Sequence, residues 1–401
     1  MPAARHRVAV VTDSTAALPA GAAERWGVTV VPLDVVVDGQ RFTEGVSLPP
    51  AALVEALRRG ARVSTSQPAP EAFERAYARA AAAGAEAVVS VHLSGELSGT
   101  VGAAHSAAER APLPVHVVDS RTAAMALGSA ALAAAWTAAG VPRDERRVLP
   151  PASRAGGAAA GAAGPRGVAG RDVDAAGRDR SRADATTGRP VSRPATAGGL
   201  EPGAPHGVLD RLDPRRLPRA LHLPEGLHLP DPRHLSEALH LPGATHRPGP
   251  VRRAGLPGPD EVAEAARAAA AAARVWFLVD SLEHLRRGGR LSSPAAALGT
   301  VLGMRPLLTV ADGRVVVAEK IRTRRAARAR LEAVAVAAAE RHERVLVAVH
   351  HLGEPEVASE MAARIAAALG PRACETVTSD AGAVLGAHVG PGLLAVVVAP
   401  A

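Results

Sequence analysis

Aromatic residues and cysteine are scarce in this chain. Phe, Trp and Tyr make up 2% of the 401 residues, whereas hydrophobic residues as a whole make up 47%. The core must therefore be built from Ala, Val and Leu. The single cysteine, Cys374, excludes a disulfide framework and a zinc site made from cysteines. Since nothing indicates an oxidising compartment, we expect a cytoplasmic protein.

Strongly apolar stretches of membrane-spanning length are also missing. The first apolar run, Val8–Val11, is too short for a signal peptide. Residues 122–142 carry no charge over about the length of a membrane span. They consist mostly of Ala, Gly, Ser and Thr, which are only weakly apolar. We therefore predict a buried helix there and no integral membrane span.

The positive charge is concentrated in the middle of the sequence. The net charge is +8, from 47 basic and 39 acidic residues. Most of the excess lies within residues 141–260, and the rest of the chain is close to neutral. A nucleic-acid-binding face would need basic residues gathered on a folded part. We therefore expect no nucleic-acid partner.

Two parts of the chain, 1–140 and 259–401, contain short apolar stretches that alternate with helical patterns. The first part includes "RVAVVTDS", "AEAVVSVHLS" and "LPVHVVDS"; the second includes "RVWFLVDS", "RVLVAVHHLG" and a hairpin with its turn at Asp312-Gly313. Short apolar strands that alternate with helices are typical of a parallel sheet covered on both faces. We predict two α/β domains, 1–140 and 259–401, with mainly parallel sheets.

The segment between them, 141–258, has a different composition. It holds more than half of the 33 prolines and no Phe, Trp or Tyr. Such a segment cannot bury enough apolar surface to offset the entropy of the chain, so we predict a long, largely disordered, low-complexity insert.

Within this insert, a hexapeptide repeat places five histidines six residues apart, at His222, His228, His234, His240 and His246. Two interpretations are open: a histidine metal site, or a tandem duplication or shifted reading frame in GC-rich DNA. The spacing of six suits neither a helix nor a hairpin, so we predict no metal.

Hydroxyl and carboxyl side chains follow several of the predicted strands. Asp13-Ser14-Thr15 follows the first strand, Thr65-Ser66 is predicted in a loop just before a helix, and Ser98-Gly99-Thr100 precedes another helix. In an open α/β sheet, ligands bind beyond the carboxyl ends of the strands, where helix N-termini attract carboxylate or phosphate. The same residue types are also preferred helix N-caps, so each site alone is equally consistent with capping.

Six short motifs in order resemble the DegV family. They are "VVTDSTAALP", "VSTSQPAPEAF", "LSGTVGAA", "VVDSRTAAMALG", "FLVDSLEHLRRGGRLS" and "GAHVGPGLLAVVV". The resemblance covers about 1–140 and 256–401. It implies two α/β domains with a cleft that holds one long-chain fatty acid. It also implies a carrier rather than an enzyme, with no cofactor, which presents the fatty-acid carboxylate to an ATP-dependent fatty-acid kinase.

The resemblance also implies the site residues. Thr65, Ser98 and His388 would bind the carboxylate, with Gly390 and Gly392 letting the backbone approach closely. Further ligand or kinase contacts would come from Arg290, Arg322, Ser66 and Ser14.

Two alternatives are open beside the carrier. The chain could be a stand-alone phosphotransferase or hydrolase that uses Asp13 or His388. It contains no P-loop, dinucleotide fingerprint or nucleophile elbow, which counts against this interpretation. It could also be a defective family member, disrupted by the insert.

Overall fold

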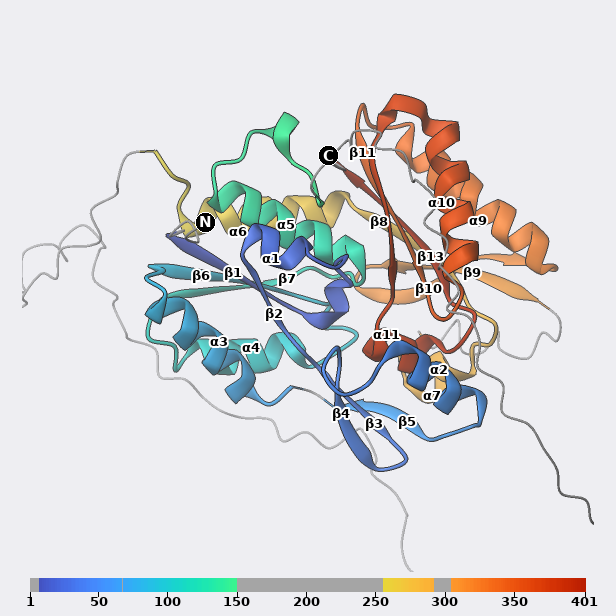
Figure 1. The fold of residues 1–401 in the computed structure, drawn as a ribbon, viewed down its shortest axis with the longest axis horizontal. Helices are drawn as coiled ribbons and strands as arrows, with labels where there is room; N and C mark the ends of the chain where they lie inside the picture. Colours follow the sequence, from blue (N-terminus) through green and yellow to red (C-terminus); the bar gives the residue numbers. More distant parts are fainter. Residues whose placement is uncertain (1–6, 67, 150–254, 292–303) are drawn as a thin grey trace, which may run out of the picture. The chain divides into compact units, whose positions relative to one another are not determined.

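A computed structural model describes residues 7–66, 68–149, 255–291 and 304–401 (Figure 1). All of them belong to one compact unit of the chain. Most of the predicted insert at 141–258, namely residues 150–254 with the histidine repeat, lies outside the described residues, so its disorder and its domain boundaries stay predictions.

The first half of the chain forms a four-stranded parallel sheet in the order β2-β1-β6-β7. Its strands are β1 (Val8–Asp13), β2 (Val28–Val31), β6 (Ala87–His92) and β7 (Val115–Asp119). Its helices are α1 (Ala22–Trp26), α3 (Pro70–Ala82), α4 (Thr100–Ala108) and α5 (Met125–Ala138). The short 3₁₀ helices are η1 (Ser14–Ala16) and η2 (Arg143–Glu145).

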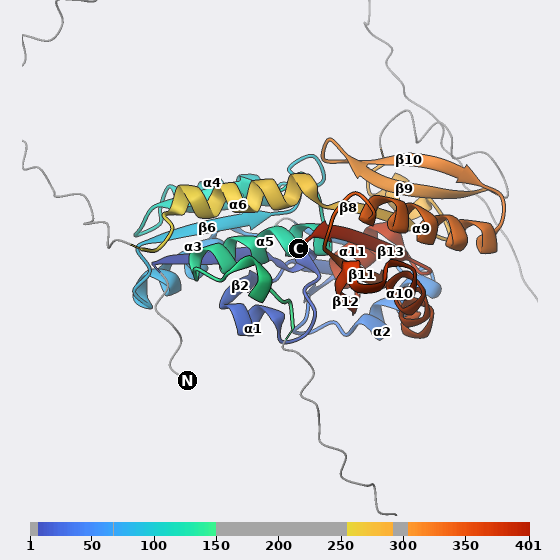
Figure 2. The same cartoon turned by 90° about the horizontal axis from the view of Figure 1, so that it is seen from above.

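Alternation along the strands determines which helices cover which face of this sheet. Val11 and Val88 pack with Phe73 and Ala104, on the face covered by α3 and α4. Val10, one position along, packs on the opposite face with α5 and with α6 (Pro259–Ala272). Helix α6 belongs to the second half of the sequence, and it runs beside α5 (Figure 2).

A small antiparallel sheet, in the order β4-β3-β5, extends from the first half. It consists of β3 (Asp34–Val37), β4 (Gln40–Thr43) and β5 (Val63–Ser66), with α2 (Pro50–Arg58) between β4 and β5. The β3–β4 turn places Asp38 at φ 49° and Gly39 at φ 86°. Two positive φ angles give a type I′ turn, whose twist matches that of a hairpin.

The second half forms a six-stranded sheet in the order β10-β9-β8-β13-β11-β12. Its strands are β8 (Arg274–Leu278), β9 (Arg305–Ala311), β10 (Arg314–Ile321), β11 (Val345–His351), β12 (Ala373–Asp380) and β13 (Leu394–Pro400). Its helices are α7 (Glu283–Arg287), α9 (Arg324–Ala339), α10 (Pro355–Leu369) and α11 (Ala383–Val389), with η4 at Gly370–Arg372. One face packs on α9 and α10, and the other faces α5.

The predicted α/β fold is confirmed, and the sheet of the first half is wholly parallel. In the second half only β11 and β12 pair in parallel, and the other neighbours are antiparallel. The hairpin with its turn at Asp312-Gly313 is present as β9–β10. A strand buried on both faces is apolar throughout in either arrangement, so its sequence does not reveal its direction.

The uncharged stretch at 122–142 contains α5, which is buried along almost its whole length. It packs on both sheets and on α6, which explains why it needs no polar face. Within the described ranges, no helix is long and apolar enough to cross a membrane.

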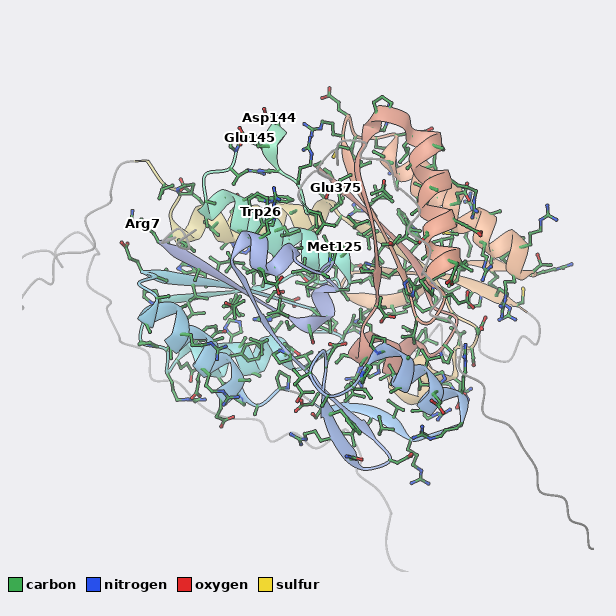
Figure 3. The ribbon with its side chains drawn as sticks, in the orientation of Figure 1. Arg7, Trp26, Met125, Asp144, Glu145 and Glu375 are labelled. Carbon is green, nitrogen blue, oxygen red and sulfur yellow. The ribbon has the colours of Figure 1, made fainter. Side chains whose placement is uncertain are left out.

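The segment after η2 forms hydrogen bonds with both halves of the fold, through Trp26 of the first and Glu375 of the second (Figure 3). The indole nitrogen of Trp26 donates to the carbonyl of Arg147 at 2.8 Å. The carboxylate of Glu375 accepts from the backbone N–H of Val148 at 2.7 Å and of Leu149 at 2.9 Å. Residues 146–149 therefore have fixed backbone partners.

Candidate functional site

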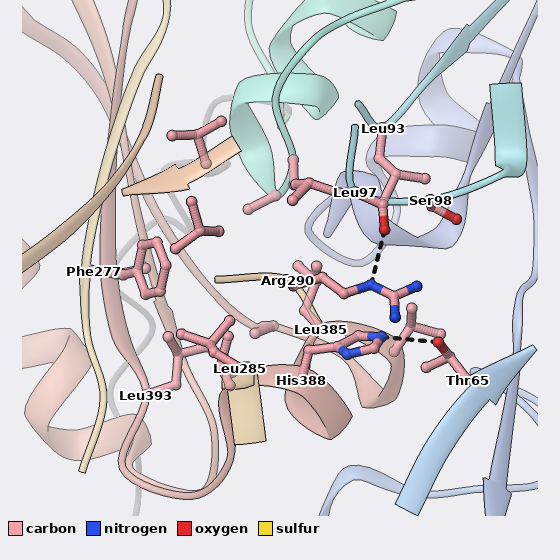
Figure 4. Close-up of a pocket in the computed structure, with 18 of the residues that line it drawn as sticks. Thr65, Leu93, Leu97, Ser98, Phe277, Leu285, Arg290, Leu385, His388 and Leu393 are labelled. Atoms are coloured by element: carbon pink, nitrogen blue, oxygen red, sulfur yellow. Dashed lines mark hydrogen bonds between the residues drawn. The ribbon is translucent and has the colours of Figure 1, made fainter. Parts of the chain in front are cut away.

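A cavity lies where the small sheet, the loops after β2, β6 and β7, and the six-stranded sheet meet. The empty space between its atoms, mouth included, is about 880 Å³. Most of its walls are aliphatic or aromatic, with Leu93, Leu97, Phe277, Leu285, Leu385 and Leu393 among them (Figure 4).

The polar side chains of this cavity gather in one place. Thr65, Ser66, Ser98, Arg290 and His388 all line it. Figure 4 shows the guanidinium of Arg290 between Ser98 on one side and His388 on the other. The result is an apolar cavity with hydroxyl, imidazole and guanidinium groups grouped together.

Thr65 and His388 are directly joined. The Thr65 hydroxyl and His388 Nε2 are 2.8 Å apart, although the two residues are 323 positions apart in sequence. Thr65 lies within β5, opposite Val35 of β3, rather than in the loop that the sequence suggested. Its strand therefore fixes its backbone, and the hydroxyl reaches His388 from a rigid element.

His388 is in the last turn of the short helix α11, not in a turn at the entry to a strand. Gly390 ends this helix at φ 78°, and Gly392 has the same φ. A β-carbon at Gly390 would overlap the ring of His284, and one at Gly392 would overlap the carboxylate of Asp280. Both glycines therefore allow close packing against these two side chains, while their role beside a ligand stays a prediction.

The imidazole of His388 is neutral at pH 7. Burial, together with the nearby positive charge of Arg290, lowers the pKa of His388 to about 4. A neutral imidazole carries one N–H and one acceptor nitrogen. One hydrogen is used in the Thr65–His388 bond, so the pair can offer one further hydrogen to an anion, while Arg290 supplies the positive charge.

Arg290 is held by backbone carbonyl groups. Its Nε donates to the carbonyl of Leu97 at 2.9 Å, and its Nη1 donates to the carbonyl of Gly288. Leu97 precedes Ser98 in the loop between β6 and α4, so this contact connects Arg290 to the serine loop. These two contacts hold the guanidinium beside the polar groups of the cavity.

The other predicted residues divide into two groups. Ser98 and Ser66 line the cavity: the Ser98 hydroxyl is 2.9 Å from that of Thr100, and Ser66 Oγ is buried without a hydrogen-bond partner among the described residues. Ser14 and Arg322 do not line it. Ser14 Oγ accepts from the N–H of Leu33 at 3.1 Å, and Arg322 is exposed just after β10.

Asp13 belongs to a closed network in the interior. Its carboxylate accepts from His92 Nδ1 at 3.0 Å, and His92 Nε2 is 2.7 Å from the hydroxyl of Ser90. This order of groups is that of a hydrolytic triad. All three side chains are fully buried, however, and the Ser90 hydroxyl also bonds to Tyr77 at 2.9 Å. None of the three lines the cavity.

His350 lines the cavity, but both of its ring nitrogens are used elsewhere. Nε2 accepts from the backbone N–H of Met125 at 3.1 Å, and Nδ1 is 3.0 Å from the hydroxyl of Ser379. No group of three or more His, Cys, Asp or Glu residues that could hold a metal occurs in the part of the chain that the structure describes.

The sequence analysis missed two contributors to the site. The carbonyl of Leu97 holds Arg290, and Gly288 lies against the ring of His388. A backbone carbonyl leaves no signal in a sequence. Gly288 stands in the quoted "RRGGR" motif, where a glycine pair next to a candidate arginine could have suggested close packing.

Comparison with known proteins agrees with this architecture. The family model of the uncharacterised DegV family COG1307 matches residues 7–142 and 251–401. A DegV domain-containing protein of Streptomyces coelicolor is 35% identical over 394 residues, with 98% of each chain covered. The chain therefore belongs to the DegV family, as its motifs indicated.

Solved structures share the fold. A fatty-acid-binding DegV family protein of Thermus thermophilus is 25% identical, with a TM-score of 0.63, covering 98% of this chain and all of its own. DegV of Bacillus subtilis, described as a fatty acid binding protein, is 22% identical, with a TM-score of 0.64 and coverage of 98% and 99%. A stearic-acid-binding protein of Eubacterium ventriosum is 17% identical, with a TM-score of 0.59 and coverage of 98% and 97%.

Proposed function

We propose that this protein binds one long-chain fatty acid in the cavity, with the carboxylate at Thr65, Ser98 and His388. The observation that carries the proposal is the Thr65–His388 hydrogen bond of 2.8 Å, beside Arg290, in a cavity whose walls are mostly apolar. The relatives from T. thermophilus, B. subtilis and E. ventriosum, which bind fatty acids, support it.

The acyl chain would supply most of the affinity. Each buried CH₂ group contributes about 0.8 kcal/mol, so twelve of them contribute about 10 kcal/mol. Association costs on the order of 4–15 kcal/mol in lost translational and rotational freedom. A long chain can therefore offset this cost and a short one cannot. The few polar groups would serve to orient the ligand rather than to hold it.

The carboxylate would be recognised by hydroxyl groups and by a positive charge. When His388 Nε2–H donates to the Thr65 oxygen, the Thr65 hydroxyl hydrogen is free for a carboxylate oxygen, and Arg290 compensates the charge of the carboxylate. Ser98 adds a hydroxyl from the loop of the parallel sheet. A fatty alcohol would lack the negative charge that Arg290 and these donors stabilise, so it should bind more weakly than the acid.

We further propose that the protein is a carrier that presents the carboxylate to a fatty-acid kinase, which supplies the nucleotide and forms the acyl phosphate. The site is rich in groups that bind a carboxylate. Asp13, the residue considered as a nucleophile, is fully buried and accepts from Thr15, His92 and Leu93. Phosphoryl transfer is therefore assigned to the partner.

Extraction of the purified protein with denaturing solvent, followed by mass spectrometry, tests the ligand. We expect close to one fatty acid per chain, and a strongly reduced amount from Thr65→Val with Ser98→Ala. Ser64→Ala with Ser106→Ala is a matched control, because both serines are exposed, one next to Thr65 and one on α4. Full occupancy in the Thr65/Ser98 variant would remove these residues from the site.

The carrier role is tested by incubation with a purified fatty-acid kinase, ATP and fatty acid. Trapping with hydroxylamine should give the acyl hydroxamate only when kinase and carrier are both present. Formation of product by this protein alone would instead support the stand-alone enzyme.

A further inference from the structure

Glu44 is a buried carboxylate that joins two distant parts of the cavity wall. It follows β4 directly and is 9% exposed. Its Oε1 accepts a hydrogen bond of 2.9 Å from the backbone N–H of Val384, which is 340 positions away in the first turn of α11. Its own backbone N–H donates to the carbonyl of Leu33 at 2.9 Å. The small sheet and α11 are therefore connected through this one residue.

The start of α11 is shaped to receive this carboxylate. Gly382 precedes the helix at φ 85°, and a β-carbon there would overlap Oε1 of Glu44. The N–H of Gly382 is held at 2.8 Å by Asp380 from the same half of the chain. One carboxylate from each half thus determines where α11 begins.

Burial of the Glu44 carboxylate costs folding free energy, so a purely structural role explains it poorly. Its Oε2 is buried and has no hydrogen bond of ordinary geometry among the described residues. Burial raises the pKa of Glu44, and the nearby Ser14 hydroxyl offsets this rise only in part. A half-satisfied buried carboxylate usually contributes less to stability than an apolar side chain of the same size. Its presence is better explained by a requirement for a defined position of α11.

The elements that Glu44 joins are those that carry the proposed head-group residues. Thr65 is on β5, which pairs with β3 in the same small sheet as β4. His388 is in the last turn of α11. The Thr65–His388 hydrogen bond connects these elements at one end of the helix, and Glu44 connects them at the other.

We propose that Glu44 is a positioning residue for head-group recognition: it holds α11 against the small sheet so that Thr65 and His388 together face one carboxylate. The proposal rests on the proposed function. It predicts that loss of Glu44 impairs recognition of the carboxylate without impairing burial of the acyl chain.

The experiment compares palmitate with hexadecanol, which has the same chain and no carboxylate. Glu44→Leu should weaken palmitate binding about tenfold, by loss of a charge-assisted hydrogen bond that orders the site. Hexadecanol binding should change by less than about twofold. Glu44→Gln, whose amide oxygen can still accept from Val384, should recover most of the difference. Glu55→Gln, an exposed site on α2, is the matched control.

A double variant separates positioning from stability. In a cycle with His388→Ala, Glu44→Leu should add no further loss of palmitate binding, because the residue through which it acts is gone. An equal loss for both ligands, or additive losses, would show that Glu44 only stabilises the fold and would overturn the proposal.

A measurement on the ligand-free protein makes the test of Glu44 independent of the proposed function. The NMR titration of His388 should change in Glu44→Leu, because the ring moves relative to Arg290, and should be unchanged in Glu55→Gln. An unchanged titration would also overturn the proposal. Failure of the wild-type protein to bind palmitate would refute the proposed function instead.

Discussion

Gly288 lies directly against the imidazole of His388. A β-carbon built on Gly288 would come within 2.6 Å of His388 Nδ1 and within 3.2 Å of the carbonyl oxygen of His284. The backbone of Gly288 has φ −73°, which any residue can adopt. A side chain at this position is therefore excluded by lack of space and not by backbone strain. The ring is therefore held between Thr65 on its Nε2 side and a bare backbone on its Nδ1 side.

Gly288→Ala tests whether this packing sets the position of the ring. The methyl group would displace the ring of His388 from its present position and disturb its hydrogen bond with Thr65, at a packing cost of about 1–3 kcal/mol. We expect fatty-acid affinity to fall about tenfold, measured by titration with a fluorescent fatty acid. Gly102→Ala on α4 is the control, because nothing lies within 4 Å of the added carbon. Equal affinity in both variants would contradict the packing argument.

Arg290→Met removes the positive charge and keeps most of the aliphatic stem. The Arg290 charge lowers the pKa of His388, so this pKa should rise in the variant. Fatty-acid binding should weaken about tenfold, because the carboxylate loses its charged partner. NMR titration and ligand titration check the two effects. Arg287→Met, at a more exposed site on α7, should leave both unchanged.

Ala395→Leu should shorten the preferred acyl chain. Ala395 lines the cavity from β13, with Phe277 and His350 beside it on the neighbouring strands. Three added carbons would displace about as many CH₂ groups of the ligand, each worth about 0.8 kcal/mol. Mass spectrometry of the extracted fatty acids should show a shift toward shorter chains. The same profile as the exposed control Ala337→Leu would place the acyl chain elsewhere.

His350 should make the protein less stable in mild acid. Burial, the largest cause, lowers the pKa of His350 from 6.5 to about 4, since Nε2 must stay unprotonated to accept from Met125. The unfolded chain therefore binds more protons between these pH values. The free energy of unfolding should be constant above about pH 7 and fall toward pH 4, by on the order of 3 kcal/mol.

Denaturant unfolding at several pH values measures this effect. His388 titrates in the same window, so the His350→Gln and His388→Gln variants must be compared with the wild type. Each should be less dependent on pH than the wild type. An unchanged pH profile in His350→Gln would assign the dependence to other groups.

The class of fold followed from the sequence more readily than the direction of its strands. The apolar strands, the helices between them and the Asp312-Gly313 hairpin were all predicted and are present. Strands β8, β11 and β13 are buried on both faces, and such strands look alike whether their neighbours run parallel or antiparallel. Their pairing depends on connections that local patterns do not contain.

The candidate site was predictable as a set of motifs but not as a geometry. The motifs selected Thr65, Ser98, Arg290 and His388, which line one cavity. They could not select Glu44, because its partner is a backbone N–H that lies 340 positions away. The resemblance implied Arg322 and Ser14 as ligand or kinase contacts, and the structure places both outside the cavity wall.

Helix α6 begins the second half of the sequence, yet it covers the parallel sheet of the first half next to α5. A chain cut between residues 149 and 255 would leave the first fragment with a bare apolar face beside Leu127 and the second with an unpaired helix. The two fragments would be complementary in the sense used for split reporters. The fold would then depend less on an unbroken backbone through the middle of the chain. It would depend more on α5 and α6, one helix from each fragment, packing on the same sheet.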